Sequence, residues 1–157
     1  MKKIIFFFLF SISIYADYLV SCFDGDTCKI KTKNDLLVNV RLDGIDAPEK
    51  AQEFGKEAKK FLVKILIGKK LELKCKGFSY NRRVCSIFIN KLNIQNEMVM
   101  NGWAMDSPKY SGGKYKKSQI LARQMKLGMW QEGNIYSPYC WRWLGTINCN
   151  KDNLYQE

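Results

Sequence analysis

Hydrophobic and polar residues alternate along the first part of the chain, in the pattern of β-strands. The segments 18–23, 27–33 and 36–43 show this pattern, and Asp-Gly-Asp and Asn-Asp turn signals separate them. In 36–43, every second residue is Leu or Val. The pattern predicts three strands joined by short turns.

Helical spacing replaces the alternation after Pro48. It predicts a helix over 51–67, followed by Gly68, with one apolar face made by Phe54, Ala58, Phe61, Leu62 and Ile65. Alternation then resumes and predicts two more strands, one over 71–75 and one over 84–89.

Two more helices are predicted, at 94–101 and 114–127. Three strands, a helix, two strands and further helices form the order of an α+β fold, a five-stranded OB-type β-barrel with about three helices. We expect this domain to cover 17–135. The tail, 136–157, contains Trp141 and Trp143 and is therefore expected to pack on the domain.

The first residues have the composition of a signal peptide, which we place at 1–16. Lys2 and Lys3 precede an apolar run from 4 to 14, which is too short for a stable membrane span. A lipidation box ending at Cys22 is an alternative, but Asp17 and Tyr18 interrupt the apolar run before it. We expect export to the periplasm or the medium.

The chain is strongly basic. Its 157 residues carry a formal net charge of +11, and 46% of them are hydrophobic, as in a folded domain. A basic surface attracts polyanions such as DNA and RNA, although excess lysine can also serve solubility alone. Charge by itself does not separate these alternatives.

Histidine is absent from the sequence. This excludes Ser-His-Asp and Cys-His hydrolysis and imidazole zinc sites. Acid–base chemistry must therefore come from Asp, Glu, Lys or Tyr. A metal held by oxygen atoms would be a hard cation such as calcium, magnesium or manganese.

The six cysteines are an even number and lack zinc-site spacing, so in an exported chain they suggest three disulfides. Counting outward from the 77–83 turn places Cys75 opposite Cys85. The remaining proposed pairs are Cys140 with Cys149 in the tail and Cys22 with Cys28 around the Asp24–Asp26 turn. For Cys22 and Cys28, an alternative is that both are small buried residues without a bond.

Four polar clusters fall in turns or at strand ends: Asp24-Gly25-Asp26-Thr27, Arg41, Asp46-Ala47-Pro48-Glu49 and Tyr80-Asn81-Arg82-Arg83. Each alone is ordinary, as a hairpin turn, a helix approach or solvent-facing arginines. Together they offer carboxylates from two loops for a calcium ion, a third carboxylate nearby, and two arginines to grip a phosphodiester. This is the chemistry that phosphodiester hydrolysis requires without histidine.

At these residues the sequence resembles the staphylococcal nuclease (thermonuclease) family. The resemblance continues through Gly102-Trp103-Ala104, Ala122-Arg123 and Gly128-Met129-Trp130, and covers roughly 18–131. It implies a five-stranded OB barrel with three helices. It also implies calcium-dependent cleavage of DNA and RNA that leaves 3′-phosphates.

The resemblance also implies residue roles. The calcium carboxylates would be Asp26 and Asp46, with the carbonyl oxygen of Ala47, and Asp24 would order the turn. Glu49 would be the base, Arg41 and Arg82 would bind the phosphate, and Tyr80 would lie beside the nucleotide.

Two departures from the family pattern stand out. Asn81 replaces the glycine usual before the second arginine, and asparagine tolerates the left-handed conformation that such a turn requires. Ser107 occupies the position of a nucleotide-stacking tyrosine, which leaves Tyr110 as the nearer aromatic residue.

The sequence therefore predicts a monomeric, calcium-dependent, sequence-nonspecific endonuclease of DNA and RNA. One alternative is a non-catalytic nucleic-acid-binding OB-fold module. Degenerate relatives of that kind lose the carboxylates or arginines, whereas this chain keeps Asp26, Arg41, Asp46, Glu49 and Arg82. A membrane-surface protein is a weaker alternative, because no basic helix with an apolar aromatic face is found.

Overall fold

The computed structural model describes residues 16–132 and 135–143 of the chain. Its main sheet has the strand order β1-β2-β3-β6-β5, and β7 pairs with β6. The strands of this sheet are β1 (Tyr18–Cys22), β2 (Thr27–Lys31), β3 (Leu37–Leu42), β5 (Glu72–Ser79), β6 (Arg82–Ile89) and β7 (Leu92–Asn93). A separate pair consists of β4 (Ile45–Asp46) and β8 (Met105–Asp106).

The sheet curls so that its two edges approach each other. Neighbouring strands are antiparallel except β3 and β6, which run parallel. Asp17, just before β1, bridges Leu71, just before β5, through a 2.8 Å hydrogen bond from the Leu71 N–H to the Asp17 carbonyl oxygen. The predicted α+β class and five-stranded order are confirmed. Among the described strands, the two edges of the sheet meet at this isolated bridge and do not form a continuous β-ladder.

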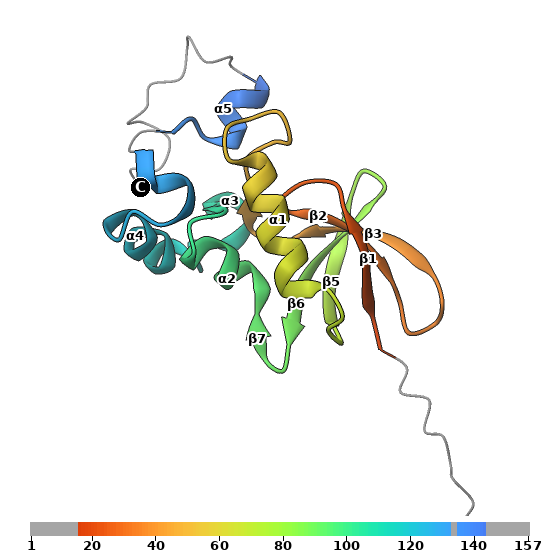
Figure 1. The fold of residues 1–157 in the computed structure, drawn as a ribbon. Helices are drawn as coiled ribbons and strands as arrows, with labels where there is room; N and C mark the ends of the chain where they lie inside the picture. The colour runs from red at the N-terminus through yellow and green to blue at the C-terminus, as the bar shows by residue number, and fades with distance from the viewer. Residues whose placement is uncertain (1–15, 133–134, 144–157) are drawn as a thin grey trace, which may run out of the picture.

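The helices lie largely on one side of the strands, as Figure 1 shows. They are α1 (Gly55–Leu66), α2 (Ile94–Met100), α3 (Pro108–Ser111), α4 (Lys116–Gln124), a 3-10 turn (Gly128–Glu132) and α5 (Pro138–Trp143). The three predicted helices correspond to α1, α2 and α4. The short α3 and α5 were not predicted, because four to six residues show no helical period. Within the described ranges, no helix is long and apolar enough to cross a membrane.

Helix α1 begins later than the predicted residue 51. Phe54 has a φ of 63°, a left-handed conformation that cannot continue a right-handed helix. Gly55 then starts the helix so close to the preceding loop that a Cβ atom would lie 1.9 Å from the carbonyl oxygen of Glu49. The chain before α1 therefore turns so that Glu49 and Lys50 lie against the first residue of the helix.

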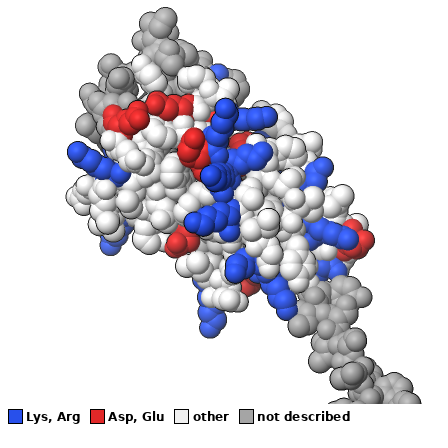
Figure 2. All heavy atoms as spheres, in the orientation of Figure 1, with Lys and Arg blue, Asp and Glu red and all other residues white. Residues whose placement is uncertain are grey.

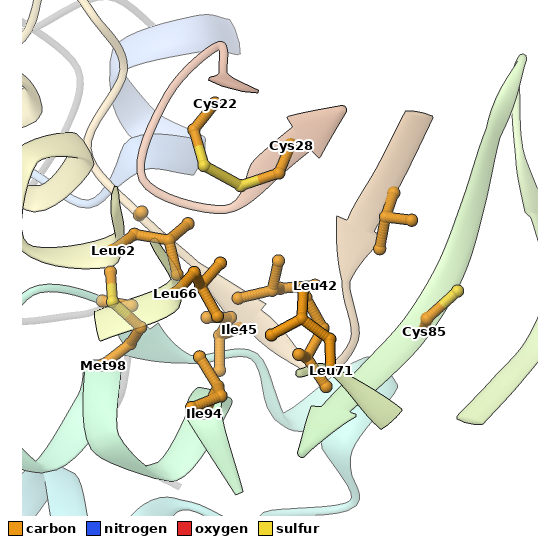
Figure 3. Close-up of a cluster of buried hydrophobic side chains, with 14 of the residues drawn as sticks. Cys22, Cys28, Leu42, Ile45, Leu62, Leu66, Leu71, Cys85, Ile94 and Met98 are labelled. Atoms are coloured by element: carbon orange, nitrogen blue, oxygen red, sulfur yellow. A yellow bond between two sulfur atoms is a disulfide. The ribbon is translucent and has the colours of Figure 1, made fainter. Parts of the chain in front are cut away.

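The core lies between the sheet and helices α1 and α2. In Figure 3, Leu62 and Leu66 of α1 and Met98 of α2 lie beside Leu42 and Ile45. All five side chains are at most 2% exposed. Burying each side chain of this size contributes roughly 1.5–3 kcal/mol, so this cluster fixes α1 on the sheet.

The structure contains two of the predicted disulfides in full. Cys75 faces Cys85 across β5 and β6, and the two are bonded. Cys22 faces Cys28 across β1 and β2, and their bond is drawn in Figure 3. The alternative of two unbonded buried residues at Cys22 and Cys28 is therefore wrong. Cys140 is buried and disulfide-bonded, and its predicted partner Cys149 lies outside the described residues.

The Cys75–Cys85 bond closes the β5–β6 hairpin. We expect the double variant Cys75→Ala/Cys85→Ala to lose about 2 kcal/mol of unfolding free energy, the lower end expected for a short closed loop. Urea unfolding followed by circular dichroism measures the loss. Non-reducing peptide mapping should recover the Cys75–Cys85 and Cys22–Cys28 peptides as linked pairs. A crosslink from Cys22 or Cys28 to the tail would contradict this pairing.

Candidate functional site

Two loops bring buried carboxylates together at one end of the sheet. Asp26 lies in the turn between β1 and β2 and is 1% exposed, and Asp46 lies on β4 and is 5% exposed. Gly25 permits the close approach, since a Cβ there would lie 2.6 Å from the Cβ of Ala47 and 2.9 Å from that of Ala58. The Ala47 N–H donates to Asp26 Oδ2 at 2.9 Å, which joins the loops directly.

The side chain of Asp24 orders the first of these loops. Its Oδ1 accepts hydrogen bonds from the N–H groups of Asp26 at 3.0 Å and Thr27 at 2.7 Å. Such a bond from an Asp side chain to the backbone two or three residues on stabilises a turn. Asp24 thus has the geometry of its predicted role.

Arg41 bridges the two buried carboxylates. It stands opposite Thr27 in the β2–β3 register, and its guanidinium contacts Asp26 Oδ1. The same guanidinium donates to Asp46 Oδ1 at 2.8 Å and to the Ile45 carbonyl oxygen at 3.3 Å. In this structure the predicted phosphate-binding arginine therefore holds the acidic pair together.

The donor set here suits a hard cation. It consists of two carboxylates within the span of one guanidinium, with the buried Ala47, the predicted carbonyl ligand, beside them. The described residues form no group of three or more His, Cys, Asp or Glu side chains able to enclose a metal ion. An ion bound by Asp26 and Asp46 would therefore complete its coordination with carbonyl, water or substrate oxygens, as calcium readily does.

Glu49 lies at the rim of this site, and its carboxylate pairs with an arginine that sequence analysis missed. Arg142 Nη1, from α5, donates to Glu49 Oε1 at 2.5 Å and to Asp46 Oδ1 at 3.1 Å. Arg142 Nη2 donates to Asp46 Oδ2 at 2.8 Å. Burial alone would lower the pKa of Arg142, but the hydrogen bonds and charges of Asp46 and Glu49 outweigh it and raise that pKa.

The start of the tail contacts the Glu49 loop, which Figure 1 shows beside α5. The buried Gln52 donates to the Tyr136 carbonyl oxygen at 2.7 Å, and its Oε1 accepts from the Glu49 N–H at 3.1 Å. The buried Ser137 hydroxyl accepts from the Cys140 N–H at 3.1 Å at the start of α5. In the described part of the tail, Tyr136 and Arg142 thus contact Gln52 and the carboxylates of Asp46 and Glu49. The aromatic content of the tail was the only sequence signal of this packing, and it did not indicate Arg142.

Arg82 lies on the other side of Asp26, across Thr27. Its Nη1 donates to Thr27 Oγ1 at 3.3 Å, and Thr27 Oγ1 donates to Asp26 Oδ1 at 3.1 Å. Arg82 also lines an open cleft with Phe23, Asp24, Thr27, Asn39, Tyr80 and Asn81. The next residue, Arg83, lies with its guanidinium carbon 5.8 Å from the centre of the Phe78 ring. Arg82 is therefore the arginine of this pair that reaches the cleft.

The hairpin tip differs from the prediction in one detail. Tyr80, and not Asn81, has the left-handed conformation, with a φ of 56°. Tyr80 and Asn81 alone connect β5 to β6, and the common two-residue hairpin turns require a positive φ at the first of their two residues. This conformation holds the Tyr80 side chain 89% exposed at the edge of the cleft.

Tyr110, the other predicted nucleotide-binding aromatic residue, belongs to α3. Lys109 Nζ lies 5.6 Å from the centre of its ring, and Lys76 donates to its carbonyl oxygen at 3.4 Å. Tyr110 does not line the cleft formed by Tyr80 and Arg82. Lys and Arg side chains are spread widely over the face shown in Figure 2.

Comparison with known proteins identifies the family of this chain. The family model described as "Staphylococcal nuclease homologue" matches residues 39–132. An "Uncharacterized endonuclease" of Haemophilus influenzae is 37% identical over 132 residues, 83% of this chain and 74% of its own. A "Micrococcal nuclease" of Shigella flexneri is 29% identical over 150 residues, 84% of each chain.

Plant relatives are longer. The "Probable staphylococcal-like nuclease CAN2" of Oryza sativa subsp. japonica is 32% identical over 126 residues, 79% of this chain but 33% of the relative. The relatives' names support a nuclease activity in general. With a family model that matches most of the described domain, the chain belongs to the staphylococcal nuclease family.

Proposed function

We propose that this protein is a calcium-dependent endonuclease that hydrolyses phosphodiester bonds of DNA and RNA with little sequence preference, leaving 3′-phosphates. The observation that carries the proposal is the convergence of Asp26, Arg41, Asp46 and Glu49 at one end of the sheet, with Arg82 one hydrogen-bonded residue away. The family membership supports nuclease chemistry at this place.

Asp26 and Asp46 are the residues that would hold calcium, with the carbonyl oxygen of Ala47. Bound there, the ion would polarise the phosphate and neutralise part of its charge. Arg41 contacts both carboxylates and so keeps them side by side.

Glu49 is the proposed base. Its carboxylate is about one-third exposed, so it can reach a water molecule at the rim of the site, unlike the buried Asp26 and Asp46. Accepting a proton from that water at a carboxylate oxygen would generate the attacking hydroxide. Because the chain has no histidine, a carboxylate is the natural group for this step.

Arg82 is the proposed donor to the five-coordinate phosphorus, on the side of the leaving 5′-oxygen. Its guanidinium lies in the open cleft and donates a 3.3 Å hydrogen bond to Thr27 through Nη1, so its other donors can turn to a phosphate. Tyr80 and Phe23 border the same cleft and offer aromatic surfaces beside the nucleotide. Stacking on such surfaces tolerates any base, in agreement with low sequence preference.

We propose export of a monomer to the periplasm or the medium, through a signal peptide at 1–16. Residues 1–15 lie outside the described part of the chain. Support comes from the disulfides Cys22–Cys28 and Cys75–Cys85, which are compatible with an oxidising compartment.

The first test of the function concerns the metal. Purified 17–157 should degrade single-stranded DNA and RNA in millimolar-range calcium and stop when a chelator is added, because Asp26 and Asp46 need a cation to act on phosphate. Gel assays on both substrates measure the degradation, and Asp46→Asn should remove it. Binding without cleavage in calcium would favour the non-catalytic module, and full activity in chelator would exclude the metal assignment.

The second test compares the contributions of the proposed base, Glu49, and of the neighbouring arginines Arg82 and Arg83 to catalysis. Glu49→Gln and Arg82→Ala should each lower kcat by about two orders of magnitude, the scale of losing a general base or a transition-state donor. Arg83→Ala is the matched control, since Arg83 lies against Phe78. If Arg83→Ala proved the damaging change and Arg82→Ala the mild one, the assignment at this turn would be wrong.

The third test concerns substrate binding. Tyr80→Ala should raise KM for single-stranded DNA about tenfold, the scale of one lost stacking contact, with a smaller effect on kcat. Tyr110→Ala is the control, because it removes another exposed tyrosine side chain that does not line the cleft. Steady-state kinetics on a short oligonucleotide would compare them, and a larger KM effect for Tyr110→Ala would place the nucleotide at α3 instead.

A further inference from the structure

Arg142 lies outside the segment matched by the family model, yet it contacts the proposed metal ligand Asp46 directly. Its guanidinium engages both carboxylate oxygens of Asp46, at 3.1 and 2.8 Å, and Glu49 Oε1 at 2.5 Å. This contact joins residues 96 positions apart in the sequence. Nothing in the proposed hydrolysis requires it.

We infer that Arg142 competes with calcium for Asp46 and thereby sets the calcium concentration at which the enzyme works. The inference rests on the proposed function, since it takes Asp46 as a calcium ligand. The tail would then act on the metal affinity of the catalytic domain without taking part in the reaction.

The competition follows from the geometry at Asp46. Its Oδ1 accepts from Arg41 at 2.8 Å and from Arg142, and its Oδ2 accepts from Arg142. Calcium binds carboxylate oxygens at about 2.3–2.6 Å and would need the same lone pairs. A divalent cation at that distance would also repel the guanidinium, so Arg142 must withdraw before calcium can bind fully.

The position of Arg142 is held by the fold and not by the side chain alone. The hydrogen bond from Gln52 to the Tyr136 carbonyl oxygen holds the start of the tail, just before α5, against the Glu49 loop. The Arg142 side chain is nevertheless 30% exposed, so it has solvent into which it can turn. Arg41, by contrast, comes from β3, the central strand of the main sheet, and its side chain is 20% exposed.

The energetic consequence is a lowered apparent calcium affinity. A ligand that binds only one of two arrangements has its affinity reduced by the fraction of molecules in that arrangement. Here the binding-competent arrangement is the one in which Arg142 has left Asp46. Removing the guanidinium should make that arrangement permanent and tighten calcium binding.

The test is a calcium titration by isothermal calorimetry on purified 17–157 and its variants. Arg142→Gln should lower the calcium Kd about tenfold, the scale of one charge-assisted hydrogen-bonded pair. Arg142→Lys keeps the charge but not the bidentate geometry. Its calcium Kd should therefore lie between that of the unaltered protein and that of Arg142→Gln. Asp46→Asn should abolish calcium binding at this site. Comparison with this variant identifies the part of the measured heat that comes from the site.

Arg83→Gln is the matched control, because it removes the same charge from a nearby surface position without touching the carboxylates. Its Kd should stay within about twofold of the unaltered protein, since exposed charges are screened by salt. The calcium concentration for half-maximal DNA cleavage should shift in parallel with Kd. Circular dichroism melting of each variant confirms that it is folded.

The outcomes distinguish the two proposals. An equal or weaker calcium affinity in folded Arg142→Gln, with calcium still bound by the unaltered protein, overturns the competition and leaves the metal-dependent function standing. Lower kcat at unchanged calcium affinity would instead make Arg142 a third phosphate-binding arginine, which also overturns it. If none of the proteins binds calcium, the proposed metal site and this inference both fail.

Discussion

The bridge formed by Arg41 between Asp26 and Asp46 is the interaction on which the site depends. Both carboxylates are almost fully buried, and an unpaired buried ion costs on the order of several kcal/mol even after relaxation. One guanidinium compensates both, and its place is set by the sheet register, in which Arg41 stands opposite Thr27 and beside Val84. A slip of one residue in the strand register would turn the Arg41 side chain to the other face of the sheet. The geometry of the site therefore depends on the correct strand pairing.

The close approach of the loops places a second constraint on the backbone. Gly25 fits between Ala47 and Ala58, and Gly55 fits against the Glu49 carbonyl, at distances that leave no room for a Cβ atom. Leu62 and Leu66 hold helix α1 on the sheet through the core. The loop that contains Gly25 and the loop that contains Glu49 then pack against the first turns of this helix. The apolar face of α1 and the position of the carboxylates are therefore linked through contacts with two glycines.

Local patterns predicted most of the fold because strands and helices leave periodic signals. Alternation predicted β1, β2, β3, β5 and β6, although not the two-residue β7, and counting from the hairpin centre placed Cys75 opposite Cys85, as observed. The late start of α1 escaped prediction because the left-handed Phe54 interrupts an otherwise helical pattern. At the hairpin tip, residue preference favoured Asn81, but the geometry of a two-residue turn placed the positive φ at Tyr80.

The candidate site was predicted in part, for the same reason. Asp26, Arg41, Asp46 and Glu49 stand in short motifs whose residue types suggest their chemistry, and the structure brings them together. Arg142 has no such motif. Its contact spans 96 positions, and only the packing of the tail against Gln52 and the Glu49 loop creates it.

Formal charge explains why an arginine and a cation can alternate at Asp46. The three carboxylates of Asp26, Asp46 and Glu49 face the two guanidiniums of Arg41 and Arg142, which leaves one negative charge. A divalent ion in place of Arg142 would bring the cluster to neutrality, and Arg82 would then balance the single charge of an incoming phosphodiester. With Arg142 in place, the carboxylates are paired but the cluster still repels a phosphate. The exchange of one cation for the other therefore links metal binding to substrate binding through charge balance alone.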